Sequence, residues 1–263
     1  MLDMQLKLNK LLLSLALVVM VSGCATQANR DPLEGLNRAV YKFNDVTDKV
    51  IIKPVASGYK AITPSPVRTG VSNFFGNINT VISAINNLLQ FKFSNAFSEA
   101  GRFVINSTFG VAGLIDVAGM DKVPVHKEDF GQTLGYWGVG NGAYLVLPIL
   151  GPSSLRDTTG LVVDIYAFDP ISYVHRDGHI AAHNVLRGVQ LLDKRTQLLD
   201  AKDILDNASL DSYAFTRDAY LQNRDTVVND GEVKAPSNDG FEPADEDSAA
   251  PAAAPAEAAP EAK

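Results

Sequence analysis

The stretch from Pro64 to Gln90 constrains the fold more than any other part of the sequence. Apolar residues recur there at three- and four-residue steps, as on one face of an α-helix. That face consists of Val71, Phe74, Phe75, Ile78, Ile82, Ile85 and Leu89. The other side carries only amides and hydroxyls, namely Ser72, Asn73, Asn77, Asn79, Thr80, Ser83, Asn87 and Gln90.

This polar face is unusual because it lacks charge. No charged residue occurs between Arg68 and Lys92, whereas a helix on the surface of a soluble protein carries charges opposite its apolar stripe. An uncharged polar face suits the wet lining of a passage or an interface. It equally suits a helix buried against polar neighbours, and the sequence leaves both interpretations open.

Periodic segments on both sides of this stretch also predict helices. The first of these segments is residues 31–51. There Asp31 should cap the helix, with Pro32 at the first helical position, and Pro54 should end or kink the helix. Its apolar stripe consists of Leu33, Leu36, Val40, Phe43 and Val50. Further helices are predicted over residues 95–110, 157–170, 179–205 and 211–223. In the segment 179–205 the stripe consists of Val185, Val189, Leu192 and Leu199.

Strand signals are weak, so the sequence predicts a single domain of the all-α class. The best strand candidate is residues 143–150, in which Pro148 argues against a central strand. After residue 24, no apolar run reaches the roughly 18 residues that a membrane-spanning helix requires. The domain is therefore expected to lie on a membrane or partly within it, without a helix that crosses it.

The chain begins with the features of an export signal. Lys7 and Lys10 precede an apolar run of signal-peptide length, which ends at Val21. Ser22 and Gly23 then lead to Cys24, the single cysteine of the chain, and the pattern resembles a bacterial lipobox. We therefore predict a signal peptide over residues 1–23, an N-acyl diacylglycerol lipid on Cys24 and a lipidated linker over residues 24–30. The alternative is an ordinary signal peptide with a chance cysteine.

The lone cysteine and its neighbour also bear on stability and location. One thiol cannot form an internal disulfide, so the fold depends on its core. Two or more acyl chains anchor a protein stably to a membrane. Ala25, rather than an aspartate, follows Cys24, and by analogy with Gram-negative lipoproteins this predicts the outer membrane, facing the periplasm.

The C-terminal segment 229–263 is dominated by alanine, proline and acidic residues. It carries the net charge of the whole chain, which is −7 with 30 acidic and 23 basic residues. Such a composition has too few apolar residues to offset the entropy of ordering, so a disordered tail is predicted. The folded domain should span residues 31–228. That domain has balanced charge and no evident basic patch, which argues against a nucleic-acid partner.

The sequence contains only incomplete versions of catalytic and metal-binding motifs. Gly138, Gly140 and Gly142 suggest a phosphate loop, but the third glycine of the dinucleotide motif and the lysine of the Walker motif are missing. No nucleophile elbow occurs in residues 151–155. His175, His179 and His183 would align only on a continuous helix, and Gly178 interrupts them. The sequence therefore predicts a non-enzyme without a metal or a dissociable cofactor.

Three long blocks resemble the MlaA (VacJ) lipoproteins. They are DPLEGLNRAVYKFN, RFVINSTFGVAGLIDVAGM and DFGQTLGYWGVGNGAYLVLPILGPSSLRD, and the likeness extends over about residues 31–232. The resemblance implies a ring-like helical domain embedded in the inner leaflet of the outer membrane. It also implies an amphipathic channel through which phospholipids leave the outer leaflet. Its implied partners are phospholipids, a trimeric porin and a periplasmic lipid carrier, MlaC.

The resemblance and the residues together suggest a role for the glycine-rich stretch. Residues 131–151 are expected to form a loop that lines or gates the passage, since glycine lets backbone approach lipid and rearrange. Its candidate residues are Tyr136, Trp137, Gly138, Gly140, Gly142 and Tyr144. The three aromatic residues suit a boundary between water and lipid. The alternative is a packed glycine-rich region whose aromatic residues belong to the core.

Four other positions are candidate site residues. Asn73 and Asn77 on the uncharged helix face are expected to line the passage. Phe43 and Asn44 occupy the place where the family carries a Phe-Asn pair linked with control of the channel.

Arg156 and Asp157 are expected to form an ion pair that fixes the exit of the glycine-rich stretch, with contact to a lipid phosphate as the alternative. The predicted function is passive phospholipid removal from the outer leaflet, which maintains lipid asymmetry. The competing hypotheses are a structural lipoprotein that tethers a porin or the cell wall, and a lipid hydrolase.

Overall fold

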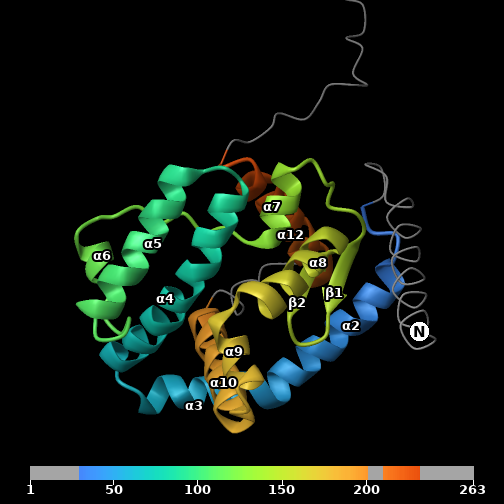
Figure 1. Ribbon diagram of the computed structural model, residues 1–263. Coiled ribbons are helices and arrows are strands. Elements are labelled where there is room, and N and C mark those ends of the chain that lie inside the picture. The colour runs from blue at the N-terminus through green and yellow to red at the C-terminus, as the bar shows by residue number, and fades with distance from the viewer. Residues whose placement is uncertain (1–29, 201–209, 232–263) are drawn as a thin grey trace, which may run out of the picture.

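The computed structural model describes residues 30–200 and 210–231. Cys24, the signal peptide and most of the acidic tail lie outside these residues. The described part is mainly helical, with one two-stranded antiparallel sheet (Figure 1). None of its helices is long and apolar enough to cross a membrane.

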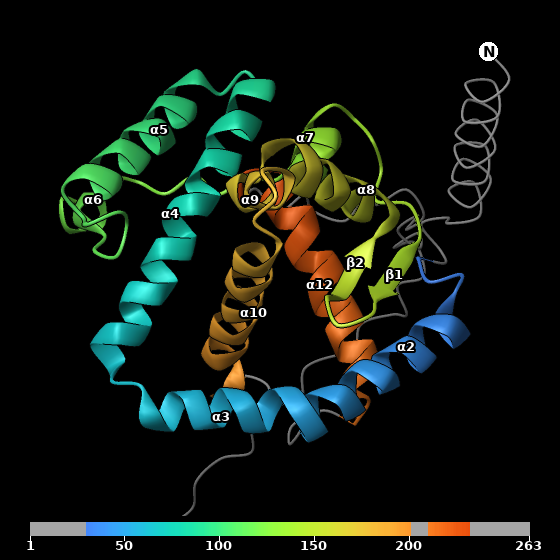
Figure 2. The ribbon, with the colours of Figure 1, turned by 60° about the horizontal axis from the view of Figure 1, so that its bottom comes forward.

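The helices follow one another around a three-sided frame. Figure 2 shows α2 (Glu34–Thr47) and α3 (Lys53–Ile62) along one side, and α4 (Ser65–Leu89) along the next. Outside α4 lie α5 (Phe93–Thr108) and α6 (Val117–Met120).

The third side holds α7 (Phe130–Tyr136), the strands β1 (Tyr144–Leu147) and β2 (Gly151–Ser154), α8 (Leu155–Val163) and α9 (Pro170–Arg176).

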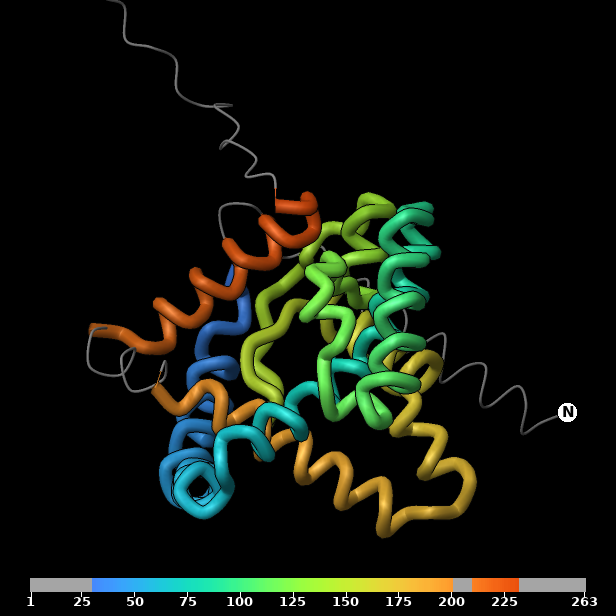
Figure 3. Tube along the Cα trace, turned by 90° about the vertical axis from the view of Figure 1, so that its left-hand side faces the viewer, coloured from blue at the N-terminus to red at the C-terminus, as the bar shows by residue number. Residues whose placement is uncertain are grey.

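Two further helices close the structure. Helix α10 (Ile180–Gln197) packs against α3, α4 and α9, and α12 (Ser212–Val228) packs against α7 and β2. Figure 3 shows α10 along the lower edge and α12 rising at the upper left. Asp211 caps α12 by accepting the backbone N–H groups of Tyr213 and Ala214, and thus α12 begins where its sequence predicted.

The long first helix differs from the prediction in two ways. Asp31 is not its N-cap: Leu33 holds that position, and Asp31 instead accepts hydrogen bonds from the side chains of Asn37 and Tyr213. Pro54 does not end the helix, which continues from α2 through a π-helical turn at Asp48–Ile52 into α3. Because proline lacks an N–H, the wider π-helical turn just before it accommodates the lost hydrogen bond.

The best strand candidate forms β1 and ends before Pro148. Strand β1 pairs only with β2, and Leu147 faces Gly151 across the turn. Tyr144 and Val146 of β1 form a hydrophobic core with Tyr213 and Leu221 of α12. The hairpin is therefore fixed between α2 and α12 by an aromatic cluster.

The apolar stripes that predicted the helices mark the interior only in part: Phe75 and Leu199 are buried, but most interior residues of these helices are polar. In α4 the buried residues are Phe75, Asn77, Thr80, Ser83, Asn86 and Asn87, and in α10 they are Gln190, Asp193 and Thr196. Val185, predicted as part of a core stripe, is 64% exposed. Periodicity places like residues on one face, but it does not decide which face turns inward.

Candidate functional site

The interior of the described domain is largely polar. Among the described residues, buried polar and charged side chains outnumber buried hydrophobic ones by more than two to one. Large apolar side chains are exposed on most elements; on α5, α6 and their connections they include Phe91, Phe93, Phe97, Phe109, Val111 and Met120. Soluble domains bury such residues and leave polar groups in water. This chain has the reverse arrangement.

The polar face of α4 supplies much of this interior. Ser72 donates a 2.7 Å hydrogen bond to Asp193 of α10, and Asn77 donates one of 2.9 Å to Ser107 of α5. Asn73 donates to the carbonyl of Leu114. The face thus packs against polar partners from neighbouring elements. Of the two interpretations of the uncharged face, the structure supports burial against polar neighbours along most of its length.

Charged partners meet this face at the other end of α4. Asn86 Nδ2 donates to Asp164 Oδ1 at 3.0 Å, and Thr133 Oγ1 donates to Asn86 Oδ1 at 2.8 Å. Gln90 Nε2 bonds both Thr133 and Glu128. A continuous buried network therefore links α4 to α7 and to the π-helical turn Asp164–Phe168. Neutral residues on α4 do not make this interior free of charge, because neighbouring elements bring carboxylates to it.

Burial changes the acidity of two carboxyl groups in this network. It raises the pKa of Asp164 to about 6, although hydrogen bonds from the backbone of Phe130 and from Asn86 oppose the change. Burial also raises the pKa of Glu128, against the hydrogen bonds from Gln90 and Lys92. In both groups, removal from water outweighs the donors that favour the carboxylate.

The glycine-rich stretch is not one loop. Residues 130–136 form α7, residues 144–147 form β1, and only residues 137–143 connect them without regular structure. Tyr136 and Trp137 are about half exposed, as expected at a boundary. Tyr144 is fully buried in the aromatic cluster, with ring contacts to Tyr213 and Tyr220. The expected single loop and the boundary position of Tyr144 are therefore wrong.

The glycines of this stretch serve different purposes. A Cβ at Gly131 would lie 2.6 Å from Asp157 Oδ1, and one at Gly135 would lie 2.7 Å from the side chain of Val228. These two glycines allow close packing of α7. Gly138 and Gly142 have positive φ angles of 89° and 66°, and nothing lies within 4 Å of a Cβ built at Gly138 or Gly140. Glycines in open space thus occur in the connection, at Gly138 and Gly140, and at Gly151 where β2 begins.

Asn44 lies against the tip of the β-hairpin. Its Nδ2 donates to the carbonyl of Leu147 at 2.9 Å, and its Oδ1 accepts the N–H of Ile149 at 2.7 Å. Its neighbour Phe43 is 54% exposed. The two residues therefore have different environments: one binds the hairpin turn, and the other belongs to the exposed apolar surface of α2.

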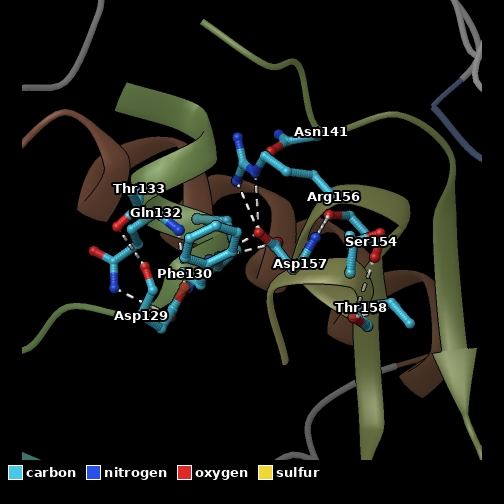
Figure 4. Close-up of polar contacts among 12 residues, drawn as sticks. Asp129, Phe130, Gln132, Thr133, Asn141, Ser154, Arg156, Asp157 and Thr158 are labelled. Carbon is cyan, nitrogen blue, oxygen red and sulfur yellow. Dashed lines mark hydrogen bonds and ion pairs between the residues drawn. The ribbon is translucent and has the colours of Figure 1, made fainter. Parts of the chain in front are cut away.

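Arg156 and Asp157 pair with each other inside a larger cluster. Arg156 Nε donates to Asp157 Oδ1 at 3.0 Å, and both side chains are buried (Figure 4). Asp157 also accepts hydrogen bonds from Tyr220 at 2.6 Å and from Arg224 of α12. Arg224 in turn binds Asp129, the N-cap of α7. The pair is thus enclosed by protein groups.

The sequence reasoning missed Asp129, Asp164 and Arg224. Asp129 is the N-cap of α7. Aspartate is a favoured N-cap residue, so its position just before residues 130–136 was a usable sequence signal. No local pattern connects Arg224 to residues almost a hundred positions earlier. Asp164 is a single charged residue within an apolar segment. That feature was the only sequence sign that its carboxyl group is buried.

The histidines do not form a metal site in the described residues. Helix α9 ends at Arg176 and α10 begins at Ile180, so Gly178 interrupts the helix as its sequence suggested. His175 and His183 contact each other across this turn, with ring centroids 5.1 Å apart. Over residues 30–200 and 210–231, no three histidine, cysteine or acidic side chains are grouped to hold a metal ion.

A surface groove of about 520 Å³ separates α2 from the start of α12. It is lined by Arg38, Lys42 and Lys49 on one side and by Asp211 and Tyr213 on the other. Arg38 binds Asp211 across the groove at 2.8 Å. This exposed ion pair bridges the two helices at the groove.

Comparison with known proteins gives a consistent result. The family model described as MlaA lipoprotein matches residues 29–227. An uncharacterized protein of Rickettsia bellii is 36% identical over 209 residues, which cover 79% of this chain and 80% of that protein.

The intermembrane phospholipid transport system lipoprotein MlaA of Escherichia coli is 37% identical over 244 residues, covering 89% of this chain and 94% of that protein.

A solved structure gives the same result at the level of the fold. It was determined in work on the structural basis for maintenance of bacterial outer membrane lipid asymmetry, and it shares 37% sequence identity with this chain. The likeness has a TM-score of 0.66 and covers 76% of this chain and 99% of the solved chain. The family match spans nearly all of the folded domain, and the chain therefore belongs to the MlaA lipoprotein family.

Proposed function

We propose that this protein removes phospholipids from the outer leaflet of the outer membrane and passes them to a periplasmic lipid carrier. The observation that carries this proposal is the reversed distribution of polarity: carboxylates, amides and hydroxyls lie inside, and large apolar side chains lie outside. An apolar exterior is stable among acyl chains, where water no longer drives those side chains inward. A polar interior offers hydrogen bonds to a head group.

The proposed position is in the inner leaflet, anchored by acyl chains on Cys24. Support comes from exposed apolar residues of the π-helical turn before α3, of α3 and of α5, such as Val50, Ile62 and Phe97, which are 68%, 83% and 73% exposed. A protein in this position reaches lipids of both leaflets without crossing the membrane by a helix. Its half-exposed Tyr136 and Trp137 would lie where acyl chains meet water.

In this proposal the passage runs beside α4 and the β-hairpin. Asn73 and Asn77 bind Leu114 and Ser107 on the outer side of α4, so they would support its wall from behind. The connection that contains Gly138, Gly140 and Gly142 would be the part of the chain that rearranges. Asn44 would control this region through the hairpin turn that it holds. This assignment places control of the passage at a hydrogen-bonded contact between α2 and β1.

The partners proposed are a trimeric porin and the carrier MlaC, as the family resemblance implies. The sequence carries neither a complete nucleotide-binding motif nor a nucleophile elbow. Transport by this component is therefore proposed to be passive, with its direction set by the proteins that receive the lipid.

The test is the phospholipid content of the outer leaflet, measured by surface labelling of intact cells that lack the gene. The expected result is a rise that the wild-type gene reverses and a Cys24→Ala copy does not, with both proteins present at equal levels. An unchanged outer leaflet would contradict transport and favour the tethering role. Release of fatty acid from vesicles by the purified protein would instead favour a hydrolase.

A further inference from the structure

One guanidinium group binds both ends of the glycine-rich segment. Arg224 Nη1 and Nη2 donate to the two oxygens of Asp129 at 2.7 and 3.0 Å. Arg224 Nε and Nη2 donate to the two oxygens of Asp157 at 3.0 and 2.8 Å. Asp129 directly precedes α7, and Asp157 lies in the first turn of α8. The segment of residues 130–156, which contains α7 and the β-hairpin, therefore begins and ends next to carboxylates that bind one arginine of α12.

The base is closely packed around this contact. A Cβ at Gly160 of α8 would lie 2.3 Å from the backbone nitrogen of Gly131, so α7 and α8 touch backbone to backbone. A Cβ at Gly131 would also lie 2.9 Å from Arg224 Nη2. Gly160 thus lets α8 approach the backbone of α7, and Gly131 leaves room for the guanidinium of Arg224. Neither role depends on flexibility.

Contact with Arg224 lowers the pKa of both carboxyl groups. Burial acts to raise the pKa of Asp129 and of Asp157, but hydrogen bonds and charge from Arg224 outweigh it and hold both pKa values below the usual range. Both groups therefore remain ionised and bound to Arg224 at neutral pH. Only arginine can bind two carboxylates in this forked manner, since lysine offers a single point charge.

The middle of the segment is packed less closely than its base. Nothing lies within 4 Å of a Cβ built at Gly138 or Gly140, and Ile149 and Leu150 at the hairpin tip are 51% and 62% exposed. The base, in contrast, combines the ion pairs of Arg224, whose side chain is 11% exposed, with backbone contact between α7 and α8. A clamp at the base would confine motion of this segment to its middle.

We propose that Arg224 is a positioning residue that clamps the two ends of the segment of residues 130–156, and that lipid export requires this clamp. The part concerning export rests on the function proposed above; the mechanical part does not. Arg224 has no role in contacting lipid here, because its donors are directed at Asp129 and Asp157.

Hydrogen exchange of the full-length lipidated protein in detergent tests the mechanical part. The variants are Arg224→Gln, which removes the charge, and Arg224→Lys, which keeps it without the fork. Arg30→Gln is the matched control, because Arg30 binds Asp225 of the same helix in an exposed pair. We expect exchange in α7 and α8 to accelerate by about tenfold or more in Arg224→Gln and less in Arg224→Lys, with α4 and α5 unchanged. Arg30→Gln should leave all of these helices unchanged.

Surface labelling of cells that carry the same variants tests the export part. Higher outer-leaflet phospholipid with Arg224→Gln and an intermediate level with Arg224→Lys, at wild-type protein levels, is the expected result. Uniform acceleration of exchange in all helices, or equal effects of the Arg224 and Arg30 variants, would overturn the clamp. Local acceleration with normal export would overturn the export part alone. If the wild-type gene itself fails to lower surface phospholipid, the proposed function falls while the exchange result still decides the clamp.

Discussion

Asn44 holds Ile149 in a left-handed backbone conformation. The amide oxygen of Asn44 accepts the N–H of Ile149 at 2.7 Å, and φ of Ile149 is 66°. A β-branched residue rarely adopts this conformation, because its side chain collides with its own backbone. The contact therefore stabilises a strained turn at the tip of the hairpin and connects it to α2.

Removing this contact should loosen the hairpin tip. We expect Asn44→Ala to lower the free energy of unfolding by about 1–3 kcal/mol, because the Ile149 N–H and the Leu147 carbonyl lose their partner. Thermal unfolding in detergent measures the change. Phe43→Ala is the control: Phe43 is 54% exposed, and we expect a change within about 0.5 kcal/mol in detergent. An equal effect of both variants would contradict a specific role for Asn44.

Replacing the strained residue should have the opposite effect. Glycine adopts positive φ without steric cost, so Ile149→Gly should stabilise the protein by up to about 1 kcal/mol. The side chain of Ile149 is half exposed, so little packing is lost. The same substitution at Leu150, which is exposed but not among the residues with positive φ, should not stabilise. The melting temperatures of the two variants decide between these expectations.

Asp164 should make stability depend on pH. Its pKa of about 6 in the folded protein exceeds the ordinary value of 3.8, so the folded state binds the proton more tightly than the unfolded state. Its contribution to stability therefore falls as pH rises from about 4 to about 6, by about 3 kcal/mol, and stays constant above. Asp116, Asp129 and Asp157 have lowered pKa values, so they change stability at a lower pH than Asp164 does.

The variant Asp164→Asn isolates this effect. The amide can still accept the N–H of Phe130, but it does not ionise. We expect the variant to gain stability relative to the wild type as pH rises from 4 to 7, measured by chemical denaturation across that range. A constant difference between the two proteins across the range would show that Asp164 does not titrate there.

Two glycines should be intolerant of substitution for reasons of space. Gly131→Ala and Gly160→Ala should each destabilise by about 1–3 kcal/mol, because the added methyl groups would overlap the ion-pair cluster and the backbone of α7. Gly140→Ala is the matched control within the same segment, since a Cβ there meets nothing within 4 Å. Equal unfolding free energies for all three variants would contradict the close packing of α7 and α8.

Trp137 provides an optical measure for these variants. It is the single tryptophan of the chain, its indole N–H donates to the carbonyl of Leu89 at 3.2 Å, and it contacts Phe130 edge to face. We expect Gly131→Ala to shift the tryptophan emission as α7 moves relative to α4, and Gly140→Ala to leave it unchanged. A shift for Gly140→Ala alone would indicate that the indole reports on the open connection.

Local sequence determined most of the helices. Three- and four-residue periodicity located α4 and α10, and the helices predicted over residues 95–110 and 211–223 correspond to α5 and α12. These features depend on hydrogen bonds and side-chain spacing within a few residues. The best strand candidate, residues 143–150, contains β1, which ends before Pro148.

Only the tertiary structure decided which faces are interior. A helix with one apolar and one polar face has the same periodicity whether water or lipid surrounds it, so the stripe of α4 could not reveal that Asn86 and Asn87 are buried while Leu88 is exposed. The role of the glycines depended equally on distant residues. Gly131 packs against Arg224 and Gly160, which approach only when α8 and α12 fold against α7, and no local pattern records such a contact.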